Sequence, residues 1–149
     1  MSELYEKSLL KLELDRVLEQ LAERAGSELG KIACRNLRPT SDLEDVQALL
    51  DQTTAACDLS TKKGYPHFYD AQDVSFALER ADMGGALNPK ELLRIAGTLR
   101  CARTVKGYTA EDEAATVLDG MFMSLTPNKY LEDKIFGAIL SEEEIADNA

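Results

Sequence analysis

The stretch NPKELLRIAGTLRCARTVKG, residues 88–107, decides how this chain folds. Asparagine is a good helix N-cap, proline suits the first helical position, and a glutamate three residues after the cap reaches back to the cap amide. The apolar residues that follow recur every three or four positions, which is the period of an α-helix. We therefore expect a helix that runs from Pro89 to about Lys106 and ends at Gly107. The buried side of this helix consists of Leu92, Ile95, Ala96, Leu99 and Ala102.

The same period recurs on both sides of this stretch, and strand-like alternation is nearly absent. It predicts further helices over about residues 10–25, 27–38, 42–60, 74–82, 117–122 and 127–139. Their expected start signals are Ser27, the capping box Ser41/Glu44 and the pair Thr126-Pro127, and a second box, Ser141/Glu144, predicts one more helix at the end. The fold class is all-α, an irregular multi-helix bundle of about six or seven helices. We expect one helical domain over 1–149, truncated at its C-terminal end.

The helix expected over 42–60 carries a regular apolar seam. Its members follow one another in alternating steps of three and four residues: Leu43, Val46, Leu50, Thr53 and Cys57. Leu49 and Ala56 widen this seam. This is the longest helix that we expect.

Charge and composition exclude several classes of function. The 149 residues hold 17 basic and 27 acidic side chains, for a net charge of −10, and residues 108–149 hold 10 acidic against 2 basic ones. This balance argues against nucleic-acid binding through bulk positive charge. No apolar run approaches the roughly 18 residues of a membrane helix. The N-terminus alternates charge with leucine, unlike a signal peptide.

The cysteines and the charged clusters predict no chemistry. Cys34, Cys57 and Cys101 have no disulfide or metal-ligand spacing, so we expect small buried residues in a reducing cytoplasm. The run Glu142–Glu144 would fan out around a helix, away from any shared metal. The stretch Gly26–Lys31 departs from a P-loop in its spacing and follows a helix, where a P-loop follows a strand. We expect no catalytic, cofactor-binding or metal-binding residue.

The only histidine, His67, stands in a loop with three aromatic residues, Tyr65, Phe68 and Tyr69. No partner motif supports a nucleophile system, so we interpret His67 as structural. The aromatic cluster leaves two alternatives open. Either the loop packs on the bundle, or it is an exposed contact surface.

Basic residues gather on the helix expected over 89–106. Arg100, Arg103 and Lys106 span about 120° of its circumference, whereas Lys90 and Arg94 lie on the opposite side. The candidate nucleic-acid contacts are therefore Arg94, Arg100, Arg103 and Lys106. The alternative, which the acidic segments favour, is that these arginines are solvated or form salt bridges within the fold.

Four segments, in this order, resemble the N-terminus of bacterial MutS-II proteins, the MutS paralogues that carry a C-terminal Smr domain. They are LELDRVL (12–18), SELGK (27–31), LRPTSD (37–42) and, most specifically, ERADMGGALNPKELLRIAGTLRCAR (79–103). The resemblance implies the front part of a MutS-type core and lever domain. A coiled-coil clamp, a Walker-type ATPase and an Smr nuclease would follow it in the parent protein.

The resemblance also implies what the parent does. Such proteins are cytoplasmic, ATP- and magnesium-dependent homodimers that act on branched DNA to suppress recombination, or on collided ribosomes. The family's ATPase and nuclease residues have no matching positions here. We therefore expect a non-catalytic structural and coupling domain whose partner is the remainder of its own chain. The alternative is a self-contained helical protein–protein interaction module.

A truncated domain should expose the surface that its missing half would cover. We expect this apolar patch on the Leu118/Phe122 helix or the Leu131/Ile135 helix, together with self-association.

Overall fold

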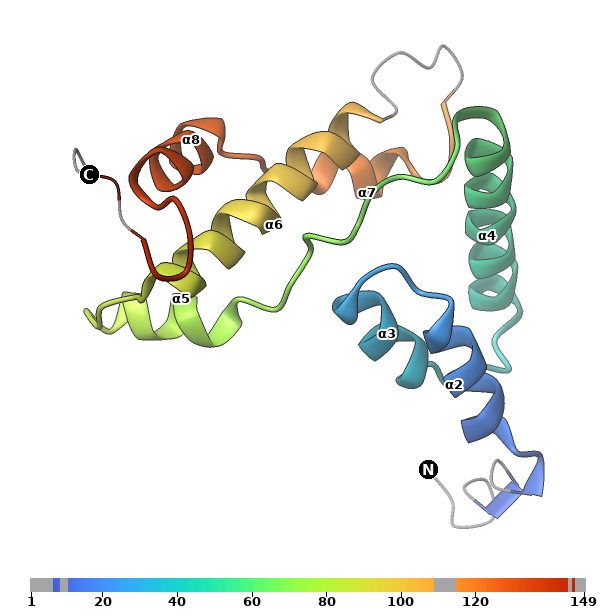
Figure 1. Cartoon of the computed structure of the whole chain (residues 1–149). Helices are drawn as coiled ribbons and strands as arrows, with labels where there is room; N and C mark the ends of the chain where they lie inside the picture. Colours follow the sequence, from blue (N-terminus) through green and yellow to red (C-terminus); the bar gives the residue numbers. More distant parts are fainter. Residues whose placement is uncertain (1–6, 9–10, 109–114, 145, 147–149) are drawn as a thin grey trace. The chain divides into compact units, whose positions relative to one another are not determined.

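The computed structural model describes residues 7–8, 11–108, 115–144 and 146, and this part of the chain is all-α, without a β-sheet. Its seven helices are α2 (Leu14–Glu23), α3 (Glu28–Arg35), α4 (Leu43–Lys63), α5 (Ser75–Asp82), α6 (Pro89–Gly107), α7 (Asp119–Ser124) and α8 (Lys129–Ala138) (Figure 1). The chain divides into two compact units, Met1–Pro39 and Thr40–Ala149. The expectation of one truncated domain over 1–149 stays a prediction.

The first unit is a pair of packed helices, α2 and α3. Leu18 and Ala22 of α2 are buried at their contact. Arg35 of α3 donates two hydrogen bonds to Glu19 of α2, of 2.8 and 2.7 Å. A helix of about ten residues is marginal alone in water, so this pairing supplies the stability that each one lacks.

The second unit is organised around α6. Its buried core joins α6 to α5 and α8 and consists of Ala77, Ile95, Ala96, Ile135 and Ile139. α7 packs against the C-terminal half of α6 (Figure 1). The predicted buried side of α6 is confirmed for Ile95 and Ala96, whereas Leu92, Leu99 and Ala102 are half-buried.

Side chains that accept hydrogen bonds from first-turn amides fix where four of the helices begin. Ser27 caps α3 by accepting a hydrogen bond from the Gly30 amide at 3.0 Å, as predicted. Asn88 and Glu91 form the predicted capping box at α6. The cap of α4 is Asp42, not Ser41, because its carboxylate accepts from two amides of the first turn. α8 likewise begins after Asn128, not at Thr126-Pro127, because the Asn128 side chain accepts from Leu131 N.

The predicted helix at Ser141/Glu144 is wrong for the described residues 141–144. The Ser141 and Glu144 backbones hydrogen-bond each other, and Leu140 N also donates to Glu144 O at 3.0 Å. Ala146 N donates back to Ala138 O at 2.8 Å. These bonds fold the chain into a tight turn instead of a helix.

The seam of α4 is largely exposed. Leu59 is the only buried residue of α4, and Leu43 and Leu50 are 78% and 56% exposed. Cys57 is exposed and Cys34 is half-buried, so only Cys101 is the buried cysteine that we predicted. The seam's period is real, but among the described residues of the unit Thr40–Ala149 no other helix covers it.

The apolar patch expected on the Leu118/Phe122 helix or the Leu131/Ile135 helix stays a prediction: Met121 and Met123 of α7 and Tyr130 of α8 are exposed. Leu118 and Ile135 are buried, and Phe122 is half-buried, because α7 and α8 pack on α6. Leu131 is exposed, since the buried position beside it is Glu132. In the described part of the chain, no helix is long and apolar enough to cross a membrane.

Candidate nucleic-acid interface

Two of the candidate contact residues, Arg100 and Arg103, lie on the side of α6 that faces α8. Arg103 donates from Nε and Nη2 to the two carboxylate oxygens of Glu132, over 3.0 and 2.9 Å. Arg100 donates from Nε to the same carboxylate over 3.4 Å. The Arg100 guanidinium also stacks on the Phe136 ring, 3.9 Å from its centroid, which is a cation–π contact. Both arginines therefore join α6 to α8.

Their shared partner, Glu132, is only 3% exposed. A buried carboxylate is stable when charged groups and hydrogen bonds replace the water it has lost. The hydrogen bond from Arg103 lowers the pKa of Glu132 below its ordinary value, against the opposing effect of burial. The same hydrogen bond raises the pKa of Arg103. Glu132 is thus ionised at neutral pH and holds both arginines in place.

Lys106, the third candidate, reaches the end of α7. Its Nζ donates to the Leu125 carbonyl over 2.8 Å and to the Met123 carbonyl over 3.4 Å. The last carbonyls of a helix lack partners within it, and a cation is favourable there. Lys106 therefore fixes α7 against α6.

The fourth candidate, Arg94, is exposed one turn after Pro89. Its charge helps to lower the pKa of Glu91, after the larger effects of the Asn88 amide and the Arg80 side chain. The four candidates do not form one surface, because three of them are engaged in joints between helices. The salt-bridged alternative is confirmed for Arg100 and Arg103, and nucleic-acid contact stays a prediction.

The aromatic segment after α4 is held along α6 by its backbone. The Cys101 thiol donates to the His67 carbonyl over 3.4 Å, and Thr98 Oγ1 donates to the Asp70 carbonyl over 3.3 Å. Burial raises the pKa of the Cys101 thiol, so it remains a protonated donor. The Tyr108 hydroxyl donates to the Leu59 carbonyl over 3.2 Å and also to the Gly64 carbonyl.

The two tyrosines of this segment are exposed to solvent. Tyr65 and Tyr69 are 85% and 73% exposed, and the His67 ring lies 6.1 Å from the Tyr69 ring. Both alternatives for this loop are thus partly correct. Its backbone packs on α6, and its two tyrosines form an exposed surface.

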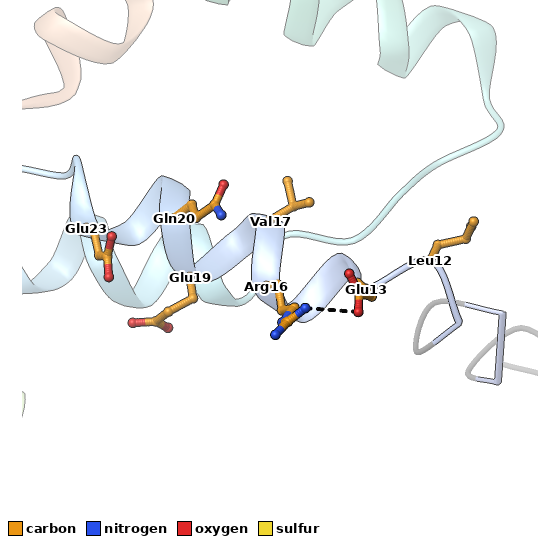
Figure 2. A pocket seen from close by; sticks show the side chains of 7 residues that line it. All are labelled: Leu12, Glu13, Arg16, Val17, Glu19, Gln20 and Glu23. Carbon is orange, nitrogen blue, oxygen red and sulfur yellow. Dashed lines mark hydrogen bonds and ion pairs between the residues drawn. The ribbon is translucent and has the colours of Figure 1, made fainter.

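A shallow hollow lies on α2 (Figure 2). Its lining residues all come from one helix and the turn before it: Leu12, Glu13, Arg16, Val17, Glu19, Gln20 and Glu23. In Figure 2, Val17 and Gln20 point to one side of the helix, and Arg16, Glu19 and Glu23 point to the other. Side chains that diverge in this way do not enclose a ligand. Among the residues that the structure describes, no cluster of His, Cys, Asp and Glu could hold a metal.

Comparison with known proteins identifies the family. No family model matches the sequence. Proteins named Endonuclease MutS2 match 97% of this chain: that of Ruminiclostridium cellulolyticum is 41% identical over 147 residues, that of Acetivibrio thermocellus 36% over 148, and that of Clostridioides difficile 35% over 148. The chain belongs to the MutS-II family. It spans 19% of the length of each of these relatives.

Two residues that organise this MutS-II chain were not predicted from its sequence. Glu132 sits in an apolar helix among other acidic residues, and its arginine partners lie about 30 residues earlier. Tyr108 follows the helix-ending glycine and ties α6 to α4 across 44 residues. The sequence signal for Glu132 is its position three and seven residues before Ile135 and Ile139, which places it on the same side of the helix as these apolar residues. We find no sequence signal for the second.

Proposed function

We propose that this MutS-II segment is a non-catalytic structural and coupling domain of a longer, ATP-dependent protein. The observation that carries the proposal is the match of 97% of the chain to relatives that are far longer. Its partner in that role is the remainder of its own chain, the clamp and ATPase domains that the family resemblance implies.

The contacts of α6 support a mechanical role. This 19-residue helix is joined to α8 by a buried carboxylate with two arginines, and to α7 by Lys106. Ion pairs with a buried member keep their geometry better than surface pairs, because breaking them leaves a charge without water. A helix held at several points along its length can transmit a displacement at one end to the other.

For the parent protein we propose the activities that its relatives and the resemblance suggest. The relatives are named endonucleases. By resemblance, the parent binds ATP and magnesium, works as a cytoplasmic homodimer, and acts on branched DNA or on collided ribosomes. None of these activities uses a residue of this segment as a catalyst.

Nucleotide binding by the 149-residue chain tests the proposal. We expect neither ATP binding in equilibrium dialysis nor phosphate release. ATP turnover that Lys31→Ala abolishes would overturn it, since Lys31 is the lysine of the only P-loop-like stretch. A Lys62→Ala variant controls for the loss of one lysine charge.

The exposed tyrosines favour a second candidate, a self-contained protein-interaction module. Aromatic side chains lose little entropy on binding and often anchor interfaces. The double variant Tyr65→Ser/Tyr69→Ser should then abolish binding of a partner protein to the isolated chain, whereas Phe76→Ser, which removes an exposed ring from α5, should not. A partner that binds only the longer protein favours the coupling role.

A further inference from the structure

Within its own unit, Thr40–Ala149, helix α4 is joined to the other elements at its C-terminal end. Among the described residues of that unit, the side-chain hydrogen bonds between α4 and other elements all lie within residues 59–64. Leu59 is also the only buried residue of this 21-residue helix. The unit therefore holds α4 by one end, whereas α7 and α8 pack against α6.

A single tyrosine makes this attachment. The Tyr108 hydroxyl, at the end of α6, donates to the Leu59 carbonyl over 3.2 Å and to the Gly64 carbonyl. In return, Lys63 Nζ donates to the Tyr108 carbonyl over 3.0 Å and lies 5.8 Å from the ring centroid. The Tyr108 ring also lies beside Phe122 of α7, with 6.4 Å between the ring centroids. Tyr108 thus joins the end of α4 to both α6 and α7.

The backbone changes direction at the residue that follows α4 (Figure 1). Gly64 has φ 78° and ψ 179°, a conformation that only glycine adopts without strain. The next segment has no regular secondary structure, and Thr98 and Cys101 hold its backbone along α6 from His67 onward. Gly64 therefore lies between a continuous helix and an anchored segment. A change in its two backbone angles would swing α4 as one body.

We propose that Gly64 is a hinge about which α4 swings, and that Tyr108 is the latch that holds α4 in the position shown. The latch consists of a few hydrogen bonds, and each is weak because water competes for both partners. Two states that differ by so little free energy are both populated, the minor one at about 0.1–10%. The hinge and the latch belong to this chain alone, so they do not depend on the coupling role proposed above.

Distances between two spin labels test the latch. One label is attached to the native Cys57 of α4 and the other to a Gly137→Cys site on α8, where a Cβ would meet no atom within 4 Å. Cys34 and Cys101 are replaced by serine. Double electron–electron resonance should then give one dominant distance. Tyr108→Phe removes the hydroxyl and keeps the ring, so a second distance should gain about three- to tenfold relative to the first.

Tyr65→Phe is the matched control for the latch. It removes the hydroxyl of a tyrosine that stands beside the hinge and is 85% exposed, so it should leave the distances unchanged. A distance distribution that Tyr108→Phe does not change, or that Tyr65→Phe changes to the same extent, would overturn the proposal.

Gly64→Ala tests the hinge separately. A Cβ on Gly64 would meet no atom within 4 Å, so the substitution acts through the backbone angles alone. Alanine is strained in this conformation, so the second distance should gain about fivefold or more. Gly120→Ala in α7 is the control, since a Cβ there also meets no atom within 4 Å and the backbone is helical. Unchanged distances in Gly64→Ala would place the hinge elsewhere and contradict the proposal.

Hydrogen exchange separates a swing of α4 from its unfolding. A helix that swings as one body keeps its backbone hydrogen bonds. The amides of residues 47–60 should therefore exchange at the same rate in Tyr108→Phe and in the unmodified chain. Faster exchange along the whole of α4 would mean that the helix unfolds when the latch is lost, and the hinge would then be refuted.

Discussion

Arg103 donates two parallel hydrogen bonds to Glu132, one to each carboxylate oxygen, over 3.0 and 2.9 Å. The two partners differ in exposure: the Glu132 side chain is 4% exposed and the Arg103 side chain 41%. The carboxylate therefore depends on the arginine to replace its water, whereas the arginine can still reach solvent. This asymmetry decides what mutations of the pair should do.

Removing the arginine should destabilise the fold more than neutralising the carboxylate. Glu132→Gln keeps the shape and leaves two arginines that can hydrate, so it should cost about 1 kcal/mol of unfolding free energy. Arg103→Ala leaves a buried charge with only the longer Arg100 bond, and it should cost more. Urea unfolding at pH 7 measures both. Arg94→Ala on the exposed side of α6 is the control, and equal effects of all three variants would contradict the explanation.

The same pair should make stability depend on acid. Glu132 has a lowered pKa in the folded state, chiefly because Arg103 hydrogen-bonds its carboxylate. The unfolded chain therefore binds this proton more readily, so the contribution is present above the ordinary pKa of 4.5 and is lost as pH falls below it. Urea unfolding between pH 7 and pH 3 should show the gap between the unmodified chain and Glu132→Gln narrowing in acid. If the difference in unfolding free energy between the two proteins stays constant with pH, the effect of Glu132→Gln comes from packing and not from the charge of the carboxylate.

The sequence predicts the parts of the fold whose causes are local. The caps at Ser27 and Asn88 were predictable because donor and acceptor lie three residues apart. The cap of α4 was misplaced by one residue, since Ser41 and Asp42 are both good caps and only the backbone geometry decides between them.

The parts that depend on distant partners were not predictable. The seam of α4 shows which residues share a side, but a period does not tell whether another helix covers that side. In α8 the apolar period of Leu131, Ile135 and Ile139 favours burial of Leu131, whereas the structure buries Glu132, one position and about 100° further round the helix. The two arginines on α6 decide this orientation, and nothing within residues 127–139 reveals them.

Two glycines of the same unit should respond oppositely to alanine. A Cβ on Gly85 would lie 2.6 Å from Arg80 Cγ and 2.9 Å from the Arg80 carbonyl oxygen, which accepts the Gly85 amide. Gly85→Ala should therefore cost about 1–3 kcal/mol. A Cβ on Gly97 would make only ordinary contacts with Asp70, the nearest at 3.5 Å, inside a long helix.

Gly97→Ala should accordingly stabilise the chain by roughly 0.5–1 kcal/mol, the usual gain of alanine over glycine within a helix. Thermal unfolding of the two variants beside the unmodified chain checks both signs. A loss at Gly97 would show that α6 and the segment around Asp70 approach more closely than the structure has them.

Nucleic-acid binding by α6 can be tested without disturbing its joints. Reversing Arg100 or Arg103 would break the contacts with Glu132, so lost binding could reflect lost folding. Arg94 is exposed and lies outside those joints, which makes Arg94→Glu the cleaner variant. A residue that contacts phosphate lowers the slope of log affinity against log salt by about one when it is removed.

We expect Arg94→Glu to leave that slope unchanged. The other three candidate cations are bound to carboxylate or carbonyl oxygens of this chain, so they do not form a phosphate-binding surface together with Arg94. Fluorescence anisotropy of a labelled branched DNA and of a single-stranded RNA, over a range of salt concentrations, measures the slope. Lys134→Glu, on the exposed side of α8, is the charge-matched control. A slope that falls for Arg94→Glu and not for Lys134→Glu would make α6 a true nucleic-acid contact.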